Sequence, residues 1–299
     1  MPIRRVGVVG GGTMGQGIIQ VTAQTGLPVV LQEISKAAIE RSIAGISVQL
    51  DEQIAKWGIT EKEKQAILSR ITTSDTYEHF DTVDLVIEAV DEDIDIKMSI
   101  FEKLHPLCPD EVIFASNTST LSVSNLAARS GRPDRFIGLH FKPPVPKRPL
   151  VEIVRGLVTS DKTFKTVRNF AEEIGKQTVE VFEWPGYVTT RLITPLINEA
   201  VFALVEGVAS AEDIDKAMVL GCGMQMGPLH LADAMGLDSL VFQMEHLFHE
   251  LGDIKYRPCP LLKKMIRGGL LGVKSGKGFF EYDRPEAAKV HPNYLALAK

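Results

Sequence analysis

The chain contains little of several features that would assign it to a specialised class of protein. Its three cysteines, Cys108, Cys222 and Cys259, are widely spaced among 299 residues. An odd number at such spacing does not form a disulfide framework, so we expect a reducing compartment and a cytoplasmic protein. The sequence has no Cys-x-x-Cys pair and no histidine-rich cluster, so no metal site is expected. It also lacks any apolar run of about 18 residues, so no membrane span is expected.

Charge of one sign is not concentrated anywhere along the chain. Lysine and arginine total 33 against 38 aspartates and glutamates, which gives a net charge of −5. Because nucleic-acid surfaces are usually basic, we do not expect nucleic acid as a partner. Hydrophobic residues make up 44% of the chain and charged residues 24%, which is typical of a globular protein with a substantial core.

The first part of the chain alternates short apolar runs with helical patterns. Strands are expected at residues 6–9, 29–31, 85–89, 112–115, 135–140, 150–154 and 178–182. Helices are expected at residues 13–25, 35–56, 61–68, 96–104 and 162–174. This alternation predicts an α/β fold of the Rossmann type, a doubly wound and mainly parallel sheet covered by helices on both faces. The helices 35–56 and 61–68 form an inserted helical hairpin, with a capping box of Thr60 and Glu63 at the second helix.

The pattern changes after Trp184-Pro185-Gly186. Only helices are expected beyond this turn, at residues 188–205, 211–220, 229–234, 237–251 and 261–267. The strand at 178–182 is therefore expected to be the last one. We predict two domains, a nucleotide-binding α/β domain of residues 1–184 and an all-helical domain of residues 185–299.

A glycine-rich loop follows the first expected strand, in the segment VGVVGGGTMGQG. One glycine of a G-x-G-x-x-G loop permits a tight turn, one lets the backbone approach a pyrophosphate, and one lets the helix pack on the strand. The residues predicted to bind the cofactor here are Gly10, Gly12, Thr13, Met14 and Gly15. Glu33 follows the second strand, where an acid accepts hydrogen bonds from ribose hydroxyls and repels a 2′-phosphate, so NAD is favoured over NADP. The alternative is a glycine turn beside a surface glutamate.

His140 and Glu152 each lie near the boundary of an expected strand. Two neighbouring strands can bring these side chains within hydrogen-bond reach. The carboxylate would then orient the imidazole and raise its pKa, and such an imidazole takes a proton from an alcohol near neutral pH. Together with the glycine-rich loop, the pair predicts oxidation of an alcohol by hydride transfer. The alternative is a core histidine with a buried partner and no chemistry.

Two further groups of polar residues follow expected strands. Ser119 ends the segment SNTS after the strand 112–115, and ligands of open α/β sheets bind beyond the carboxyl ends of strands. Its hydroxyl can contact a substrate alcohol and the cofactor, whereas the alternative is ordinary turn or N-cap chemistry. Glu92 follows the strand 85–89 with Lys97 one helical turn later, so both are predicted to lie near the nicotinamide half of the cofactor. The alternative for these two is a solvated charged face.

Five further histidines have no partner that the sequence reveals, and we expect them to be structural. They are His105, His230, His246, His249 and His291.

Segments along most of the chain resemble the L-3-hydroxyacyl-CoA dehydrogenase family, over residues 4–282. The segments that carry the resemblance are VGVVGGGTMGQG, VIEAVDEDIDIK, ASNTSTLSV, GLHFKPPVPKRPLVEIV, PGYVTTRLITPLINEA, ASAEDIDKAM, MGPLHLAD and GVKSGKGFFEY. The resemblance implies an NAD-dependent, reversible oxidation of the 3-hydroxyl of an acyl-CoA, a reaction of fatty acid metabolism and β-oxidation. It also implies a homodimer formed through the helical domain.

The resemblance implies a role for each site residue. His140 would be the general base with Glu152 as its partner, and Ser119 would contact the substrate oxygen. The residues that would bind NAD through side chains are Glu33, Glu92, Lys97, Ser119 and Lys274. Lys56 would contact the phosphates of coenzyme A, and Ser119 would also lie at the bound acyl-CoA.

The chain departs from the usual pattern of this family at three places. The family usually has HFFNP where residues 140–144 read HFKPP, so Pro143 replaces an asparagine and has no backbone N–H. Thr190 replaces an asparagine that, in the family, helps to hold the substrate and the His–Glu pair. The threonine hydroxyl can still donate one hydrogen bond at the catalytic site. Gln49 stands where a serine is expected near the coenzyme A phosphates. These departures keep the proton-transfer pair and leave the acyl-chain chemistry open.

Three functions remain open from the sequence. The first is an NAD-dependent 3-hydroxyacyl-CoA dehydrogenase. The second is a dehydrogenase of a free 3-hydroxy acid, as in the related gulonate and lambda-crystallin branch. The third is a non-catalytic nucleotide-binding protein, which the changes at Pro143 and Thr190 motivate.

Overall fold

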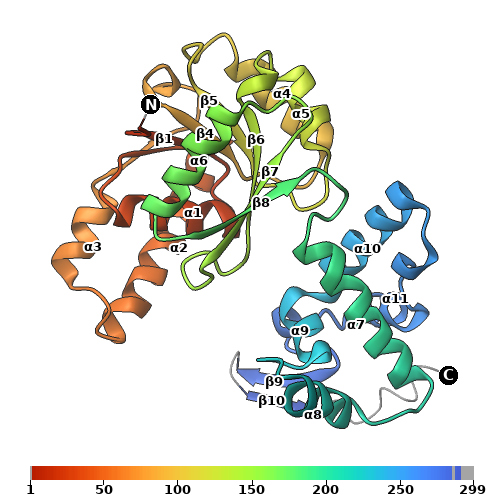
Figure 1. The fold of residues 1–299 in the computed structure, drawn as a ribbon. Coiled ribbons are helices and arrows are strands. Elements are labelled where there is room, and N and C mark those ends of the chain that lie inside the picture. The colour runs from red at the N-terminus through yellow and green to blue at the C-terminus, as the bar shows by residue number, and fades with distance from the viewer. Residues whose placement is uncertain (1, 285–286, 291–299) are drawn as a thin grey trace. The chain divides into compact units, whose positions relative to one another are not determined.

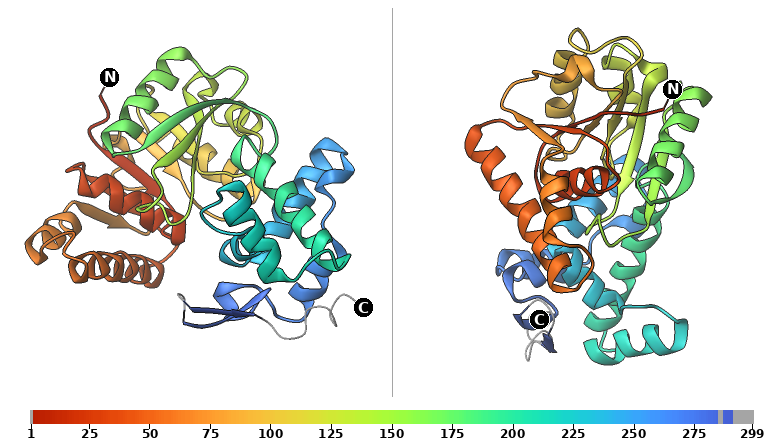
Figure 2. Two further views of the ribbon diagram at one scale, coloured as in Figure 1. Left: turned by 60° about the horizontal axis from the view of Figure 1, so that its bottom comes forward. Right: turned by 90° about the vertical axis from the view of Figure 1, so that its left-hand side faces the viewer.

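The computed structural model describes residues 2–284 and 287–290. Within them the chain forms two compact units, and the boundary along the chain lies between Tyr187 and Val188. Figures 1 and 2 draw the units from three directions. This boundary lies within three residues of the Trp184-Pro185-Gly186 turn, where the sequence pattern changes. Each unit has an apolar core of its own and is described separately below.

The first unit is built on one eight-stranded sheet with the order β3-β2-β1-β4-β5-β6-β7-β8 (Figure 1). The strands are β1 (Val6–Val9), β2 (Val29–Gln32), β3 (Ile71–Ser74), β4 (Leu85–Glu88), β5 (Ile113–Ser116), β6 (Phe136–Phe141), β7 (Leu150–Arg155) and β8 (Gln177–Phe182). All neighbouring strands are parallel except β6 and β7, which are antiparallel. The prediction of a doubly wound, mainly parallel sheet is confirmed.

Alternate residues of the central strands contribute to two separate apolar cores. In β4, Leu85 and Ile87 belong to one core and Val86 belongs to the other, because successive side chains of a strand point to opposite faces. The helices of this unit are α1 (Thr13–Gln24), α2 (Lys36–Ala55), α3 (Glu61–Leu68), α4 (Ile94–Leu104), α5 (Val123–Arg129) and α6 (Asp161–Glu173). Buried residues of α1, α2, α3 and α6 lie in the first core, and those of α4 and α5 lie in the second. The sheet is therefore covered on both faces, as predicted.

The inserted helical hairpin consists of α2 and α3. The Thr60 hydroxyl accepts a hydrogen bond from the backbone N–H of Glu63 at 3.2 Å, and the Glu63 carboxylate accepts one from the backbone N–H of Thr60 at 2.7 Å. This is the capping box that the sequence predicts. Leu50 of α2 and Ile67 of α3 are buried in the first core, which attaches the hairpin to the rest of the unit.

The sequence does not predict two elements of the first unit. Strand β3 lies at the edge of the sheet, with Thr72 and Thr73 exposed, so it has no continuous apolar run to mark it. Helix α5 spans only seven residues, which is too short for a recognisable helical period. Both elements are stabilised by neighbours in the fold rather than by a strong local pattern.

The second unit is mainly helical, as predicted, but it also contains a two-stranded sheet. Its helices are α7 (Thr189–Val205), α8 (Ala211–Cys222), α9 (Pro228–Met235), α10 (Leu237–Leu251) and α11 (Pro260–Arg267). Strands β9 (Phe280–Arg284) and β10 (Ala287–Val290) pair in antiparallel orientation. The expectation that residues 178–182 form the last strand is wrong, because β9 begins at Phe280, two residues beyond the glycine-rich segment 276–278, and its pattern is too short to separate from a loop.

Asp233 ties the start of β9 to helix α9. Its carboxylate accepts hydrogen bonds from the backbone N–H groups of Phe279 and Phe280, both at 3.0 Å, and from the Tyr282 hydroxyl at 3.0 Å. A Cβ on Gly278 would lie 1.9 Å from this carboxylate, so only glycine fits there. Burial raises the pKa of Asp233 to about 6 despite these hydrogen bonds.

Short 3-10 helices complete both units. They are η1 (Phe80–Thr82), η2 (Pro133–Arg135), η3 (Ile254–Tyr256) and η4 (Val273–Ser275). Across residues 2–284 and 287–290, no helix combines the length and the apolarity that crossing a bilayer requires. The same residues contain no group of three or more histidine, cysteine or acidic side chains that could hold a metal ion.

Candidate active site

Five of the candidate site residues of the first unit lie at or beyond the carboxyl ends of parallel strands. Gly10 follows β1, Glu33 follows β2, Glu92 lies beyond β4 and Ser119 lies beyond β5, while His140 is the fifth of the six residues of β6. Because these five strands are mutually parallel, their carboxyl ends meet at one edge of the sheet. Open α/β sheets bind ligands at this edge.

The glycine-rich loop between β1 and α1 has the geometry of a dinucleotide site. Gly10 has φ +93°, a left-handed value that favours glycine, and a Cβ on Gly15 would lie 1.9 Å from the Gly10 carbonyl oxygen. A Cβ on Gly12 would meet no described atom within 4 Å. Gly12 is also the N-cap of α1 and no described side chain caps it, so the first N–H groups of the helix stay available for an anion. These residues fit the pyrophosphate of a dinucleotide.

Glu33 lies against this loop. Its Oε1 accepts a hydrogen bond from the Gly11 backbone N–H at 2.7 Å and lies 3.4 Å from the Ser42 hydroxyl oxygen. The carboxylate is thus held beside the phosphate loop, where it can accept hydrogen bonds from ribose hydroxyls and would repel a 2′-phosphate. Its half-exposed position at the strand end is consistent with the predicted role in NAD binding.

His140 and Glu152 are directly opposite each other in the antiparallel pair β6 and β7. His140 Nδ1 lies 2.7 Å from Glu152 Oε2, and the two residues are 5% and 0% exposed. Side chains opposite each other in an antiparallel pair share one face, which explains this contact. When Nδ1 donates its proton to the carboxylate, Nε2 keeps the lone pair that can accept a proton.

The net electrostatic effect on His140 differs from the expectation. Burial and the positive charge of Lys142 lower the pKa of the His140 imidazole. The hydrogen bond and charge of Glu152, together with the charge of Glu92, act to raise this pKa, but burial and Lys142 outweigh them. Glu152 thus acts to raise the pKa, as expected, but the net shift of the His140 pKa is downward, because the sequence does not reveal how deeply the imidazole is buried. Burial also lowers the pKa of Lys142 to about 8. The result is an imidazole that is neutral at pH 7 and ready to accept a proton.

Ser119 lies in a loop that Glu92 holds. Glu92 Oε1 accepts hydrogen bonds from the Thr118 hydroxyl at 2.6 Å and from the backbone N–H groups of Ser119 and Thr120 at 2.7 and 3.0 Å. Although burial acts to raise it, Lys97 and these hydrogen bonds hold the pKa of Glu92 below its ordinary value. Glu92 therefore carries a negative charge that organises the Ser119 loop.

Lys97 is completely buried, so the alternative of a solvated charged face is wrong for this residue. Its Nζ lies 2.7 Å from Glu88 Oε1 and 3.5 Å from Glu92 Oε2. A direct contact of Lys97 with NAD stays a prediction, since the observed ammonium is enclosed between two carboxylates. Sequence reasoning missed Glu88, although a charged residue within the apolar run LVIEAV is a signal that it has a buried partner.

The other predicted site residues lie elsewhere. Lys56 is the exposed C-cap of α2, and Gln49 of the same helix donates a hydrogen bond to Gln16 Oε1 at 3.2 Å. Thr190 and Lys274 belong to the second unit, where Thr190 is buried in the first turn of α7 and Lys274 pairs with Asp238. Their roles in binding coenzyme A, substrate and NAD stay predictions.

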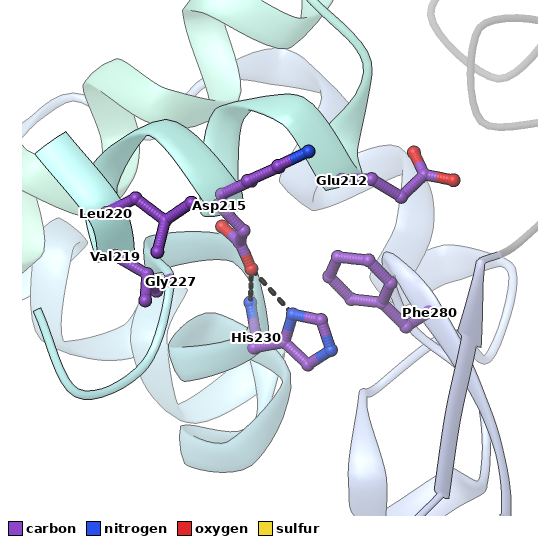
Figure 3. A pocket seen from close by; sticks show the side chains of 8 residues that line it. Glu212, Asp215, Val219, Leu220, Gly227, His230 and Phe280 are labelled. Carbon is purple, nitrogen blue, oxygen red and sulfur yellow. Dashed lines mark hydrogen bonds and ion pairs between the residues drawn. The ribbon is translucent and has the colours of Figure 1, made fainter.

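His230 is one of the residues that line a pocket of about 380 Å³ in the second unit (Figure 3). His230 Nδ1 lies 2.6 Å from Asp215 Oδ2, and its ring stacks on Phe280 with ring centroids 3.6 Å apart. The Asp215 carboxylate also accepts hydrogen bonds from the backbone N–H groups of Leu229 and His230 at 2.8 and 2.9 Å, so it anchors the start of α9. His230 therefore has partners that the sequence did not reveal.

A second histidine also has a partner that the sequence did not reveal. His105 Nδ1 lies 3.2 Å from Arg132 Nη2, and the guanidinium of Arg132 lies 4.3 Å from the centroid of the Phe114 ring. These contacts belong to the second core and agree with a structural role. His291 lies outside the described residues.

A glycine-rich dinucleotide loop and a buried His–Glu pair at one sheet edge define the class of nicotinamide-dependent dehydrogenases. The model of the 3-hydroxyacyl-CoA dehydrogenase NAD binding domain matches residues 5–184, and the model of the 3-hydroxyacyl-CoA dehydrogenase C-terminal domain matches residues 186–282. The chain belongs to the 3-hydroxyacyl-CoA dehydrogenase family, which confirms the resemblance seen in the sequence. It is an NAD-dependent oxidoreductase, so the predicted cofactor is confirmed as well.

Relatives and solved structures match nearly the whole chain. A protein of Bacillus subtilis (strain 168) named "Probable 3-hydroxybutyryl-CoA dehydrogenase" is 44% identical over 95% of this chain and 99% of its own length. The "Hydroxyacyl-coenzyme A dehydrogenase, mitochondrial" of Rattus norvegicus is 39% identical over 94% and 91% of the two chains. The crystal structure of (S)-3-hydroxybutyryl-CoA dehydrogenase PaaH1 from Ralstonia eutropha is 45% identical, with a TM-score of 0.89 over 94% of this chain and 100% of that one.

Proposed function

We propose that the chain oxidises the 3-hydroxyl of a 3-hydroxyacyl-CoA to the 3-oxoacyl-CoA, reversibly, with NAD as the acceptor. The observation that carries this proposal is the contact of 2.7 Å between His140 and Glu152. The pair lies at the same sheet edge as the glycine-rich loop, and its imidazole is neutral near pH 7. Relatives named 3-hydroxybutyryl-CoA dehydrogenase, matched over 96% or more of their own length, support the choice of substrate class.

In the proposed mechanism, His140 is the general base. Its Nε2 takes the proton of the substrate 3-hydroxyl, while Glu152 holds Nδ1–H and stabilises the imidazolium that forms. When bound, NAD supplies the hydride acceptor for the substrate carbon. In the reverse direction the protonated His140 donates its proton to the ketone oxygen. Ser119, on the loop held by Glu92, contacts the same oxygen and orients it.

The remaining predicted contacts extend this proposal to the whole of NAD and of the acyl-CoA substrate. Glu33 binds the adenosine ribose of NAD, and Glu92 and Lys97 organise the nicotinamide side. Lys274 and Thr190 of the second unit contribute to NAD and to the substrate, and Lys56 contacts the phosphates of coenzyme A. Residues 1–184 then serve as the NAD-binding domain, and residues 185–299 serve as a helical substrate and dimerisation domain.

A homodimer, a cytoplasmic location and a place in β-oxidation accompany this proposal. Exposed apolar side chains on α7 and α10 support an interface formed by the second unit. They are Val188, which caps α7, and Leu192, Leu196, Val205, Phe242 and Phe248. The molecular mass in solution, compared with 32.9 kDa for one chain, tests the dimer.

A free 3-hydroxy acid is the competing substrate class. Gln49 bonds to Gln16 rather than offering a serine hydroxyl to a phosphate, so one predicted coenzyme A contact is altered. The exposed Lys56, between the two helices of the hairpin, favours the thioester, because an exposed ammonium can bind a phosphate. The third candidate, a protein that binds nucleotide without catalysis, is disfavoured because the chain belongs to a dehydrogenase family and retains the His–Glu pair.

Formation of NADH with matched substrates tests these alternatives. The purified chain is assayed with 3-hydroxybutyryl-CoA and with free 3-hydroxybutyrate, and then with 3-hydroxyacyl-CoAs of increasing length and with a terminal carboxylate. We expect kcat/KM to be higher for the thioester. Equal or higher kcat/KM for the free acid would favour the second candidate, and absence of NADH with every substrate would favour the third.

A further inference from the structure

We infer that Glu88 is a positioning residue for the reaction: through Lys97 it holds Glu92, and through Glu92 it holds the loop that carries Ser119. Neither the sequence patterns nor the proposed mechanism assigns a role to Glu88. The inference rests on the proposed function, because it concerns the residue that contacts the substrate oxygen. It explains why a charged residue ends a strand that is otherwise apolar.

Glu88 is the last residue of β4 and is 0% exposed. Its Oε1 accepts hydrogen bonds from Lys97 Nζ and from the Val90 backbone N–H, both at 2.7 Å, and its Oε2 accepts one from the Ser116 hydroxyl at 2.6 Å. Ser116 is the last residue of the neighbouring strand β5. Glu88 thus joins the carboxyl ends of two strands from which the site loops begin.

Because Glu88 is fully enclosed, it cannot touch the substrate or the cofactor. Any effect on the reaction must pass through its partners. Lys97, which is also 0% exposed, is the partner that leads toward the site. A buried ammonium is stable only when it is paired and hydrogen bonded. Lys97 meets this condition with Glu88 at 2.7 Å, the Val90 carbonyl oxygen at 3.2 Å and Glu92 at 3.5 Å.

Glu92 transmits the position of Lys97 to the catalytic loop. One carboxylate oxygen of Glu92 faces Lys97, and the other receives the hydrogen bonds of Thr118, Ser119 and Thr120. The Ser119 hydroxyl lies 3.2 Å from this second oxygen. A shift of Lys97 would therefore move or release Glu92, and the three residues bound to it would lose their common acceptor.

The alternative is that Glu88 only neutralises Lys97 and stabilises the sheet. In that case the loss of Glu88 lowers stability without changing the Ser119 loop in the folded protein. A variant that weakens the same strand without touching the charges separates the two cases. Val86→Ala is suitable, because Val86 is fully buried two residues earlier in β4 and belongs to the second core.

The test uses the full-length chain with Glu88→Gln, Val86→Ala and, as a second route, the double variant Glu88→Gln/Lys97→Met. The double variant removes both buried charges, so it provides a folded protein if Glu88→Gln alone unfolds because Lys97 has lost its nearest carboxylate. Hydrogen exchange is measured by mass spectrometry without ligand over the segment that contains Ser119 and Thr120. Turnover of 3-hydroxybutyryl-CoA and NAD binding are measured on the same preparations.

We expect exchange of this segment to become about tenfold faster in Glu88→Gln or in the double variant, because Ser119 and Thr120 lose a fixed acceptor. We also expect kcat to fall by roughly 10²-fold through misplacement of the Ser119 hydroxyl. In Val86→Ala, the exchange rate of this segment and kcat should both stay near those of the wild type. Segment exchange and kcat that stay within about threefold of Val86→Ala in both charge variants would overturn the inference.

The wild-type control separates this inference from the proposed function. A wild-type chain that binds NAD but forms no NADH with any 3-hydroxyacyl-CoA contradicts the proposed function. In that case the exchange experiment still decides whether Glu88 holds the loop. An active wild type with a loop unchanged by both charge variants contradicts only the role of Glu88.

Discussion

Replacement of Glu152 by glutamine tests how the dyad works, because the change keeps the shape of the side chain and removes its charge. The glutamine oxygen can still accept the hydrogen bond from His140 Nδ1, which lies 2.7 Å from Glu152 Oε2 in the wild type. What is lost is the attraction between a carboxylate and the imidazolium that forms as the proton is taken. The ground state loses less electrostatic stabilisation, because the wild-type imidazole is neutral near pH 7.

The size of the effect follows from this geometry. The imidazolium charge spreads over the ring, so the two charge centres lie about 4 Å apart, and at an effective dielectric constant of about 20 they attract by about 4 kcal/mol. With about 1.4 kcal/mol for each factor of ten, kcat should fall by roughly 10³-fold. KM should change little, because the lost interaction is made mainly in the transition state. The acid limb of the pH profile should also move to lower pH, since Glu152 acts to raise the pKa of His140.

Steady-state formation of NADH from 3-hydroxybutyryl-CoA across a range of pH provides the assay. Glu180→Gln is a matched control, because Glu180 lies on the neighbouring strand β8 and pairs with Arg155 at the surface. This control should stay within about threefold of the wild type. A kcat for Glu152→Gln that also stays within threefold would show that the carboxylate charge contributes nothing to proton transfer.

Three further predictions concern the same sheet edge. Glu33→Ala should reduce the preference for NAD over NADP, because no carboxylate would then repel a 2′-phosphate; an unchanged ratio of the two kcat/KM values would contradict this role. Lys142→Met should move the acid limb of the oxidation profile to higher pH, because the Lys142 charge lowers the pKa of His140; Lys142→Arg, which keeps the charge, should leave the limb in place. Gly15→Ala should lower the melting temperature, because its Cβ would lie 1.9 Å from a carbonyl oxygen, whereas Gly12→Ala should keep stability and weaken NAD binding measured by titration. Equal melting temperatures for these two glycine variants would show that the loop is less tightly packed than described.

The features that the sequence predicts well depend on short-range patterns. The capping box of Thr60 and Glu63 needs only three residues of spacing, and its geometry is as expected. The glycine-rich loop combines a strand, a turn and a helix within one short segment, so its conformation could also be anticipated. The pairing of His140 with Glu152 follows from two strand ends and the antiparallel register of β6 and β7.

The features that the sequence does not predict depend on three-dimensional surroundings. The pKa of His140 falls because burial and Lys142 together outweigh Glu152, and the depth of burial is not visible in a strand pattern. Glu88 was missed because its partners Lys97 and Ser116 come from two different elements of the fold. Strand β9 is anchored by Asp233, which accepts a hydrogen bond from Phe280 across 47 residues, a contact that no local pattern reveals.

In the proposed mechanism His140 takes the proton of the substrate hydroxyl, and the variant His140→Gln removes the group that does so. NADH formation from 3-hydroxybutyryl-CoA and the Kd for NAD are measured for the wild type and for this variant. We predict that kcat falls by roughly 10²–10⁴-fold, as for the loss of a general base, while the Kd for NAD changes little. A variant that binds NAD normally and retains kcat within about threefold of the wild type would contradict the claim.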